Sequence, residues 1–301
     1  KELNIFLMND MSFSAIQKSQ LEGAKRIDAE YYQPNFLLNA KKVSNFGFIE
    51  LNKLSTIDIT KGETPLWRGD DYTKSGIPFL RSENLVPCSL DLSDIVFITK
   101  KVHKRMLRSK IFHGDVLLAI VGATIGHTGL VGKEYTEYNT NQANAIVRPE
   151  NERMSAFLSI VLETKYCQLQ IERLKGGGAR DNLDLHEVRI LKIPKPDEVI
   201  LNFSSQTIQA FQKLYNDARS KYLEAEKSLL TELKILNFQQ DDFLSTVINL
   251  SEAQAANRFD AEYFNSPCNK MLSQVTKNKT VKLGELADIT KGVEPGADVY
   301  Q

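Results

Sequence analysis

Apolar residues recur with heptad spacing over residues 204–236. Their positions alternate in steps of three and four, which is the a/d pattern of a coiled-coil seam. The seam consists of Ile208, Phe211, Tyr215, Ala218, Tyr222, Ala225 and Leu229. No proline or glycine interrupts the stretch, and Ser204 and Ser205 offer N-cap hydroxyls. The pattern predicts a helix about 50 Å long that packs against a partner helix, with packing on its own domain as the simpler alternative.

Residues 48–196 show a different pattern, in which short apolar and β-branched runs lie between glycines and prolines. The predicted strands are 77–80, 95–98, 116–121, 145–147 and 188–194. The continuous apolar run at 116–121 predicts a buried strand, and helical spacing over 154–174 predicts a helix. Residues 1–47 are predicted to be helical and connecting. The expected fold class is mixed α/β: a globular, strand-rich domain attached to a long coiled-coil-type helix.

An eight-residue pattern near the start of the chain occurs a second time. Residues 25–32 are KRIDAEYY, and residues 257–264 are NRFDAEYF. The similarity extends in both directions: residues 2–5 match 232–235, Phe13 matches Phe243, and the sequence DITKG at 58–62 recurs at 288–292. This predicts an internal repeat of long period, with one full unit and the start of a second. We therefore expect the chain to be a fragment of a longer, two-unit protein.

Charge is balanced over the whole chain but uneven along it. The formal net charge is zero, yet residues 99–114 contain His103, His113 and six lysines or arginines without an acidic residue. Such a patch can neutralise phosphates, although a solvated helix face is the commoner reason for a charge run. The three cysteines show no disulfide or zinc spacing. Without a membrane-length apolar run or a signal peptide, we expect a cytoplasmic protein.

Patterns typical of catalysis are not found in the sequence. There is no adenine-methyltransferase loop of the Asn-Pro-Pro-Tyr type, and the turn GATIG at 122–126 lacks the G-x-G-x-x-G spacing. Asp181, Asp184 and Glu187 lie close together, but their neighbours favour a polar loop and a helix start over a metal site. The histidines have no partner pattern for nucleophilic catalysis. A binding protein is predicted. The triple glycine at 176–178 before Arg180 fits either a helix C-cap or a close approach to a ligand.

Short motifs in the chain resemble, in order and spacing, those of the specificity (S) subunit of type I restriction–modification enzymes. They are GETP at 62–65, GIPFLRSENL at 76–85, GDVL at 114–117, GATIG at 122–126, TNQ at 140–142, and the glycine-rich loop before 188–196. The resemblance extends over residues 48–301. His127 departs from the pattern, which has lysine at this position.

The resemblance implies two target-recognition domains separated by long antiparallel helices, each domain reading one half of a split double-stranded DNA target. It implies partner modification subunits that hold S-adenosylmethionine and methylate adenine, and a motor-nuclease subunit. The chain itself is expected to be no enzyme and to hold no cofactor or metal. Residues 1–47 would be a helical connecting segment that ends a preceding repeat unit, and residues 48–200 would form the target-recognition domain. The spacer helix would be residues 201–240. Residues 241–301 would form a connecting segment and the start of a second, truncated target-recognition unit. The fragment is also expected to form a homodimer through the long helix.

Candidate DNA contacts follow from residue type and position. Phosphate contacts are predicted for Lys61, Arg68, Lys100, Lys101, Lys104, Arg105, Arg108 and Lys110. Base-edge contacts are predicted for Arg81, Asn84, Asn141, Gln142 and Arg180. Trp67 either stacks near DNA or packs in the core. Two alternatives stay open: the target-recognition region of a fused type II methyltransferase–endonuclease, and a coiled-coil adaptor that does not bind DNA.

Overall fold

The computed structural model describes residues 5–8, 11–19, 21, 26–65, 69–175, 182–236, 247–260, 262–264, 266–277 and 280–290. The chain forms two compact units, residues 1–213 and residues 214–301, which we call the N-terminal and C-terminal units. The predicted mixed α/β fold with a long helix is confirmed. In the described ranges, no helix is long and apolar enough to cross a membrane.

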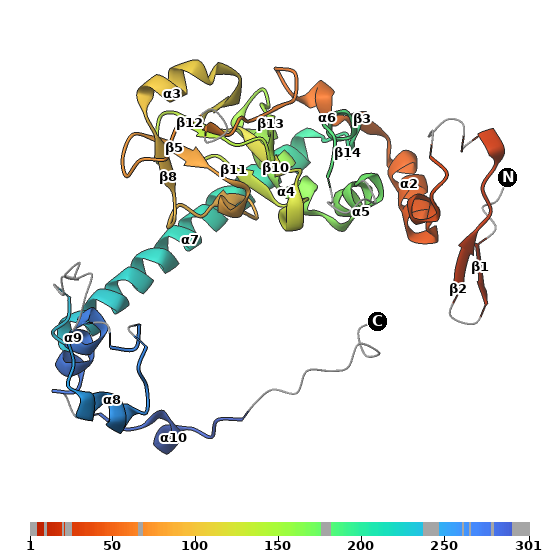
Figure 1. The fold of residues 1–301 in the computed structure, drawn as a ribbon. Helices are drawn as coiled ribbons and strands as arrows, with labels where there is room; N and C mark the ends of the chain where they lie inside the picture. Colours follow the sequence, from red (N-terminus) through yellow and green to blue (C-terminus); the bar gives the residue numbers. More distant parts are fainter. Residues whose placement is uncertain are drawn as a thin grey trace. The chain divides into compact units, whose positions relative to one another are not determined.

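Two four-stranded sheets form the centre of the N-terminal unit (Figure 1). The first has the order β11 (Thr128–Leu130), β10 (Val116–Ala119), β13 (Asn144–Val147) and β4 (Thr60–Lys61). The second has the order β8 (Val96–Ile98), β5 (Ile77–Leu80), β12 (Tyr138–Thr140) and β9 (Lys110–Ile111). All pairs are antiparallel except β5–β12, which is parallel. The predicted strands at 77–80, 95–98, 116–121 and 145–147 are therefore confirmed, with small shifts at their ends.

Strand β10 is buried on both faces, as its unbroken apolar run predicts. Val116 and Leu118 face a core that includes residues of the helices α4 (Glu152–Glu163) and α5 (Lys165–Leu174). Leu117 and Ala119 face a second core shared with Leu80, Ile111 and Tyr138 of the other sheet. Because neighbouring residues of a strand point to opposite faces, this one strand joins both cores.

The predicted helix over 154–174 is two helices, since α4 ends and α5 begins at Thr164. Asn151 caps α4 by accepting a hydrogen bond from the Met154 amide at 3.0 Å. Glu163, at the end of α4, accepts a 3.0 Å hydrogen bond from the Thr128 amide of β11. The helix pair is thus attached to the first sheet by a polar contact as well as by its apolar face.

The prediction of a strand at 188–194 is wrong for the first half of this range. Residues Leu185–Arg189 form helix α6, and only Lys192–Pro194 form a strand, β14, which pairs with β3 (Phe48–Glu50). Asp184 and Glu187 form a capping box at the start of α6. This capping box is the local signal that fixes the helix.

The prediction for residues 1–47 is only partly right. Two strands, β1 (Ile5–Met8) and β2 (Met11–Ser14), form a hairpin that was not predicted. The helices η1 (Ala29–Tyr32) and α2 (Pro34–Phe46) follow. Proline at the first position of α2 and Gly47, with a φ of 73°, at its end match the usual preferences of helix termini.

The remaining short elements connect the strands. They are η2 (Leu51–Leu54), η4 (Ser82–Asn84), β6 (Leu85–Val86), β7 (Ser89–Leu90), α3 (Lys100–Arg105), η5 (Leu107–Ser109) and η6 (Gly122–Thr124). Strands β6 and β7 pair as a hairpin. In the C-terminal unit the structure describes α8 (Leu250–Ala256), α9 (Ser266–Val275) and α10 (Leu283–Leu286).

The long helix α7 (Glu198–Glu232) begins and ends earlier than predicted. Asp197 supplies the N-cap, because its side chain accepts a hydrogen bond from the Ile200 amide at 2.8 Å. Ser204 is buried inside the helix, so its interpretation as an N-cap is wrong.

The two sheets meet at a corner formed by residues 140–144, where the chain leaves β12 and enters β13. The backbone amide of Gly62 donates to the Asn144 carbonyl at 3.3 Å, and the next amide, of Glu63, donates to the Thr140 carbonyl at 3.1 Å. A Cβ on Gly62 would lie 2.5 Å from the Thr140 carbonyl carbon and even closer to the carbonyl oxygens of Thr140 and Asn141. Only glycine allows this approach.

We predict that Gly62→Ala lowers the free energy of unfolding of the N-terminal unit by about 1–3 kcal/mol, because the backbone of the corner must move to admit the methyl group. Gly132→Ala is the matched control, since the three atoms nearest to a Cβ there belong to the carboxylate of Glu134, a side-chain end that can turn away. Urea denaturation of both variants measures the difference. Equal stability of Gly62→Ala and the control would contradict this account of the corner.

Candidate nucleic-acid interface

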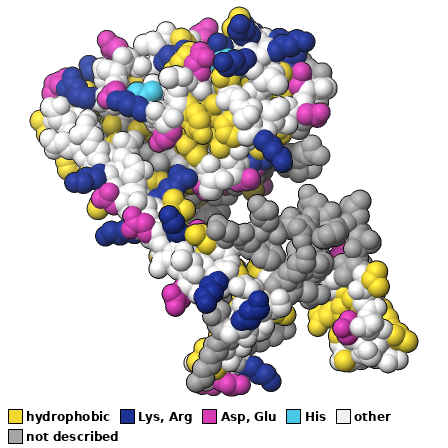
Figure 2. All heavy atoms as spheres, turned by 90° about the vertical axis from the view of Figure 1, so that its left-hand side faces the viewer, with side chains coloured by type: hydrophobic (Ala, Val, Ile, Leu, Met, Phe, Trp, Pro, Cys, Tyr) yellow, Lys and Arg dark blue, Asp and Glu magenta, His cyan; other side chains and the backbone are white. Residues whose placement is uncertain are grey.

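Helix α3 and the following η5 carry most of the predicted phosphate contacts. Lys100, Lys101, Lys104 and Arg108 are exposed, and none of them forms an ion pair with the part of the chain that the structure describes. Figure 2 views the side on which α3 lies in Figure 1 and shows lysine and arginine side chains gathered along the upper edge of that face. These four side chains are therefore available to an anionic partner.

The other two cations of this stretch have partners within the protein. The Arg105 guanidinium donates to the carboxylate of Asp70, which raises the pKa of Arg105, and nearby Glu63 adds to the effect. Lys110 lies 3.5 Å from a carboxylate oxygen of Glu137. The positive charge of each side chain is therefore partly neutralised within the protein.

Local sequence explains how α3 is held. Thr99 caps the helix, its hydroxyl accepting a hydrogen bond from the Val102 amide at 3.2 Å. Val102 and Met106, four residues apart, are buried in a cluster with Phe79 and Ile98 of the second sheet. The lysines lie on the opposite, exposed side of this short helix.

His103 is buried beneath the helix and joins it to strand β12. The Asn139 amide donates to His103 Nδ1 at 3.1 Å and to the Met106 carbonyl at 3.2 Å. Because Nδ1 accepts, the neutral ring carries its proton on Nε2, which lies 3.4 Å from the Glu137 carboxylate. Burial lowers the pKa of His103, and the charge of Lys110 lowers it further, while Glu137 opposes both.

The corner between the two sheets brings together three further predicted residues. Lys61 of β4 is exposed and lies opposite Ala145 in the ladder. Asn141 and Gln142 are half-buried in the corner itself, and Gln142 accepts a hydrogen bond from the Thr64 hydroxyl. Since η5 packs beside β4, the corner adjoins the basic stretch.

Two predicted base-reading residues, Arg81 and Asn84, form contacts within the protein. Asn84 is buried, and its amide group accepts from the Arg81 backbone amide at 2.8 Å and donates to the Asp91 carbonyl at 3.1 Å. Arg81 forms ion pairs with Glu83 at 2.7 Å and Asp94 at 3.3 Å. Burial removes Asn84 from the candidate set, while base contact by Arg81, whose side chain is 22% exposed, stays a prediction. Arg68, Arg180 and Trp67 lie outside the described residues.

The predicted helix seam is divided between two environments. Ile208 is buried in the core of the N-terminal unit, so packing on its own domain, the simpler alternative, holds at this position. Tyr222 and Leu229 are 72% and 59% exposed. Ala218 and Ala225 are exposed, Phe211 is at the margin of exposure, and Tyr215 is half-buried. The partner-helix role of these residues stays a prediction.

Sequence reasoning missed the buried polar residues that hold the interface in place. Asn139, Thr140 and Asn144 are fully buried, and the Asn144 amide donates to the Thr140 hydroxyl at 2.9 Å. Asp115, buried at the start of β10, accepts two hydrogen bonds from Arg148, each 2.8 Å long. The available signal was a polar residue inside a stretch that has the pattern of a strand. A polar group buried at such a position needs a fixed hydrogen-bond partner.

The candidate interface contains the kinds of polar group that bind nucleic acid. Among the described residues, no group of three or more histidine, cysteine, aspartate or glutamate side chains could hold a metal ion. Asp184 and Glu187 cap α6, and burial raises the pKa of Glu187. The groups of the candidate interface are ammonium, guanidinium and amide, which are hydrogen-bond partners for phosphates and base edges.

Comparison with known proteins identifies the family. Residues 43–225 match the family model described as the type I restriction modification DNA specificity domain. The chain belongs to this family. The resemblance inferred from the short motifs is thereby confirmed.

One curated relative of this type I specificity family is the type I restriction enzyme EcoBI specificity subunit of Escherichia coli. It is 31% identical over 131 residues, which cover 42% of this chain and 27% of the relative. The match thus spans little more than a quarter of that protein.

Two solved structures, both named as S or HsdS subunits, are also similar to this chain. The type I restriction–modification S subunit from M. genitalium has a TM-score of 0.44 and 16% identity, covering 65% of this chain and 46% of that one. The HsdS subunit from Thermoanaerobacter tengcongensis has a TM-score of 0.39 and 12% identity. The match covers 68% of this chain and 50% of that one.

We predict that His103 makes the stability of this specificity domain sensitive to acid. An unfolded histidine takes up a proton near pH 6.5, and the folded one does so only at lower pH, so acidification through this range favours unfolding. Unfolding free energies of the wild type and His103→Gln, measured between about pH 7 and pH 5, should show a smaller loss in the variant. His127→Gln, at an exposed site, is the control. Equal pH dependence of all three proteins would contradict the prediction.

Proposed function

We propose that residues 48–196 bind one half of a bipartite double-stranded DNA target and that the chain is the DNA-recognition part of a type I restriction–modification system. The family match supports this proposal, and the observation that carries it is the set of four exposed cations on α3 and η5, which form no ion pair with any described residue. A coiled-coil adaptor without DNA binding would leave these cations without a role.

The basic stretch is proposed to position the domain on the phosphate backbone. The short helix α3 carries Lys100, Lys101 and Lys104 close together, and Arg108 follows on η5. The chain has no net charge, so attraction to DNA depends on this local field rather than on the overall charge. Phosphate contacts of this kind fix register but carry no sequence information.

The corner between the sheets is proposed to read bases. Its polar groups are the half-buried amides of Asn141 and Gln142 and the exposed ammonium of Lys61. The Asn141 side-chain oxygen accepts from the Ala143 amide at 3.2 Å, and Gln142 accepts from Thr64, so both amides have a fixed orientation. Asparagine and glutamine pair with adenine in the major groove, and lysine pairs with guanine.

The rest of the assembly is proposed from the family. Helix α7 would act as the spacer between the two half-targets and dock modification subunits, which would supply S-adenosylmethionine and methylate adenine. A motor-nuclease subunit would cut unmodified DNA, and the chain itself would do no catalysis. Tyr222 and Leu229, exposed on α7, would contribute to a helical contact with a partner or with a second copy of the chain.

The proposal predicts that Lys100→Ala, Lys101→Ala and Lys104→Ala together weaken binding to all DNA sequences alike. Each phosphate contact contributes about 0.9 to the slope of log affinity against log salt, so the triple variant should lose up to about 3 from that slope. The measurement is a salt titration of duplex binding by the full chain, assembled with its modification subunits if binding requires them.

The matched control removes three other exposed lysines, Lys41, Lys42 and Lys195, and so changes the net charge equally. It should keep the wild-type slope. An unchanged slope in the α3 variant, or equal losses in both variants, would show that α3 faces away from the DNA.

A further inference from the structure

The chain leaves the core directly beside the corner, at the end of strand β10. The Ile120 amide donates to the Ala143 carbonyl of the corner at 2.7 Å, and Ile120 itself is only 2% exposed. The next residue, Val121, has extended backbone angles and is 38% exposed. Because neighbouring residues of an extended strand point to opposite faces, the Val121 side chain turns away from the core that contains Ile120.

An antiparallel bridge sets Val121 opposite Asn182. The Leu183 amide donates to the Ile120 carbonyl at 2.9 Å, which fixes this pairing. Side chains directly opposite one another in an antiparallel pair lie on the same face, with Cβ atoms about 5 Å apart. An exposed apolar group and an exposed amide therefore lie side by side next to the corner.

The Asn182 amide is oriented by a neighbouring residue. Its Nδ2 donates to the carboxylate of Asp184, the residue that caps α6, at 3.5 Å. An amide group has two hydrogens and one accepting oxygen. One hydrogen and the oxygen are thus free to bind a partner, since the described residues supply none for them.

The backbone on the Val121 side of the bridge is also fixed. The turn that follows is closed by hydrogen bonds from the Ile125 amide to the Gly122 carbonyl at 3.2 Å and from the Gly126 amide to the Ala119 carbonyl at 3.0 Å. Both side chains are therefore presented from ordered backbone, as a contact that discriminates between ligands requires.

The major-groove edge of an A·T base pair matches these two groups. Adenine presents the N7 acceptor and the N6 amino donor, which together bind an asparagine amide through two hydrogen bonds. Thymine presents a methyl group on the same edge, and apolar side chains pack against it. A G·C base pair lacks the methyl group and has a different pattern of donors and acceptors.

We propose that Val121 and Asn182 together read one A·T base pair of the half-target, with Asn182 bound to adenine and Val121 packed on the thymine methyl group. The inference rests on the proposed DNA recognition by residues 48–196, and it extends the reading surface beyond Asn141 and Gln142. The sequence did not indicate either residue, because only the folded chain brings the two segments together.

The test scans the half-target with modified duplexes. The target is first determined by selection from random duplexes, with the full chain assembled with its modification subunits if binding requires them. Deoxyuridine in place of each thymidine removes only the methyl group, and 7-deazaadenine in place of each adenine removes only the N7 acceptor. We expect one base pair at which uracil weakens binding about fourfold and 7-deazaadenine weakens it roughly tenfold.

Variants of the two residues should each remove one of these effects. Val121→Ala should lose the sensitivity to uracil and keep that to 7-deazaadenine, and Asn182→Ala should do the reverse at the same base pair. Val121→Ile should keep both sensitivities, because the larger side chain still reaches the methyl group. Cooperative urea unfolding of each variant checks that its domain is folded.

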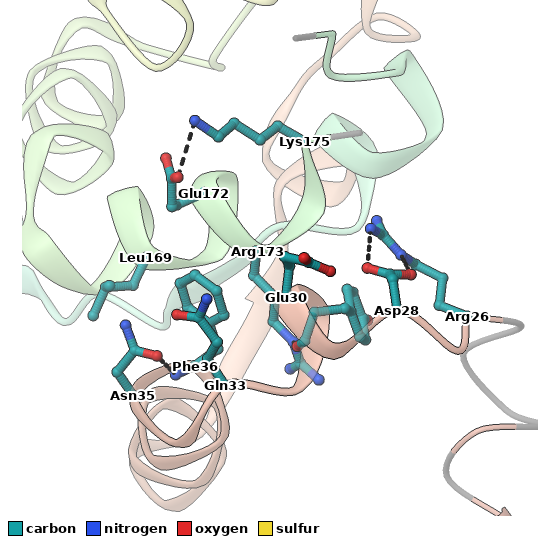
Figure 3. A pocket seen from close by; sticks show the side chains of 11 residues that line it. Arg26, Asp28, Glu30, Gln33, Asn35, Phe36, Leu169, Glu172, Arg173 and Lys175 are labelled. Carbon is teal, nitrogen blue, oxygen red and sulfur yellow. Dashed lines mark hydrogen bonds and ion pairs between the residues drawn. The ribbon is translucent and has the colours of Figure 1, made fainter. Parts of the chain in front are cut away.

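Two matched controls carry the same chemical changes elsewhere in the N-terminal unit. Val199→Ala is at an exposed site on α7. Asn35→Ala is at an exposed site that lines a cavity between η1, α2 and α5, where Arg26 is paired with Asp28 at 2.6 Å (Figure 3). Both controls should keep the wild-type sensitivities at every base pair.

The proposal would be overturned if the wild type has no base pair that is sensitive to both modifications, or if the two alanine variants keep both effects. Sensitivities that map to two different base pairs would overturn it as well. If no duplex sequence is bound specifically, the proposed function fails and this inference fails with it. Specific binding without the shared base pair refutes this inference alone.

Discussion

The close approach of Gly62 to the corner at residues 140–144 is the constraint on which the recognition domain depends. The corner is where the chain passes from one sheet to the other, and it is closed by two backbone hydrogen bonds from Gly62 and Glu63. A side chain at position 62 would collide with the backbone carbonyl groups of Thr140 and Asn141. Because Thr140 and Asn144 are buried and hydrogen-bonded to each other, the corner has little freedom to rearrange.

Strand β12 extends this constraint to the proposed DNA surface. Its residue Asn139 is bonded to His103 and so holds helix α3, and the next residue, Thr140, begins the corner. Successive residues of a strand face opposite sides, so one short strand fixes both the cations proposed to contact phosphates and the amides proposed to read bases. The relative position of these two groups is thereby set by buried hydrogen bonds rather than by the exposed side chains themselves.

Much of this fold could be predicted from the sequence, but the direction of individual polar side chains could not. The unbroken run of β10 indicated a buried strand, and both cores confirm it. Arg81 and Asn84 were predicted to read bases from residue type alone, yet type does not show that Asn84 caps a neighbouring turn. At 185–189 the capping box formed by Asp184 and Glu187 favoured a helix over the predicted strand. Ile208 fits a heptad seam in the sequence, but only tertiary packing shows that it faces its own domain.

The central claim is that residues 48–196 specify one half of a DNA target. The most direct measurement is a map of methylated adenines in cells that carry this chain with its partner subunits, before and after residues 48–196 are exchanged for the corresponding domain of another family member. The account predicts that one half of the methylated motif changes while the other half and the spacing stay the same. An unchanged motif, or methylation unaffected by loss of the chain, would contradict it.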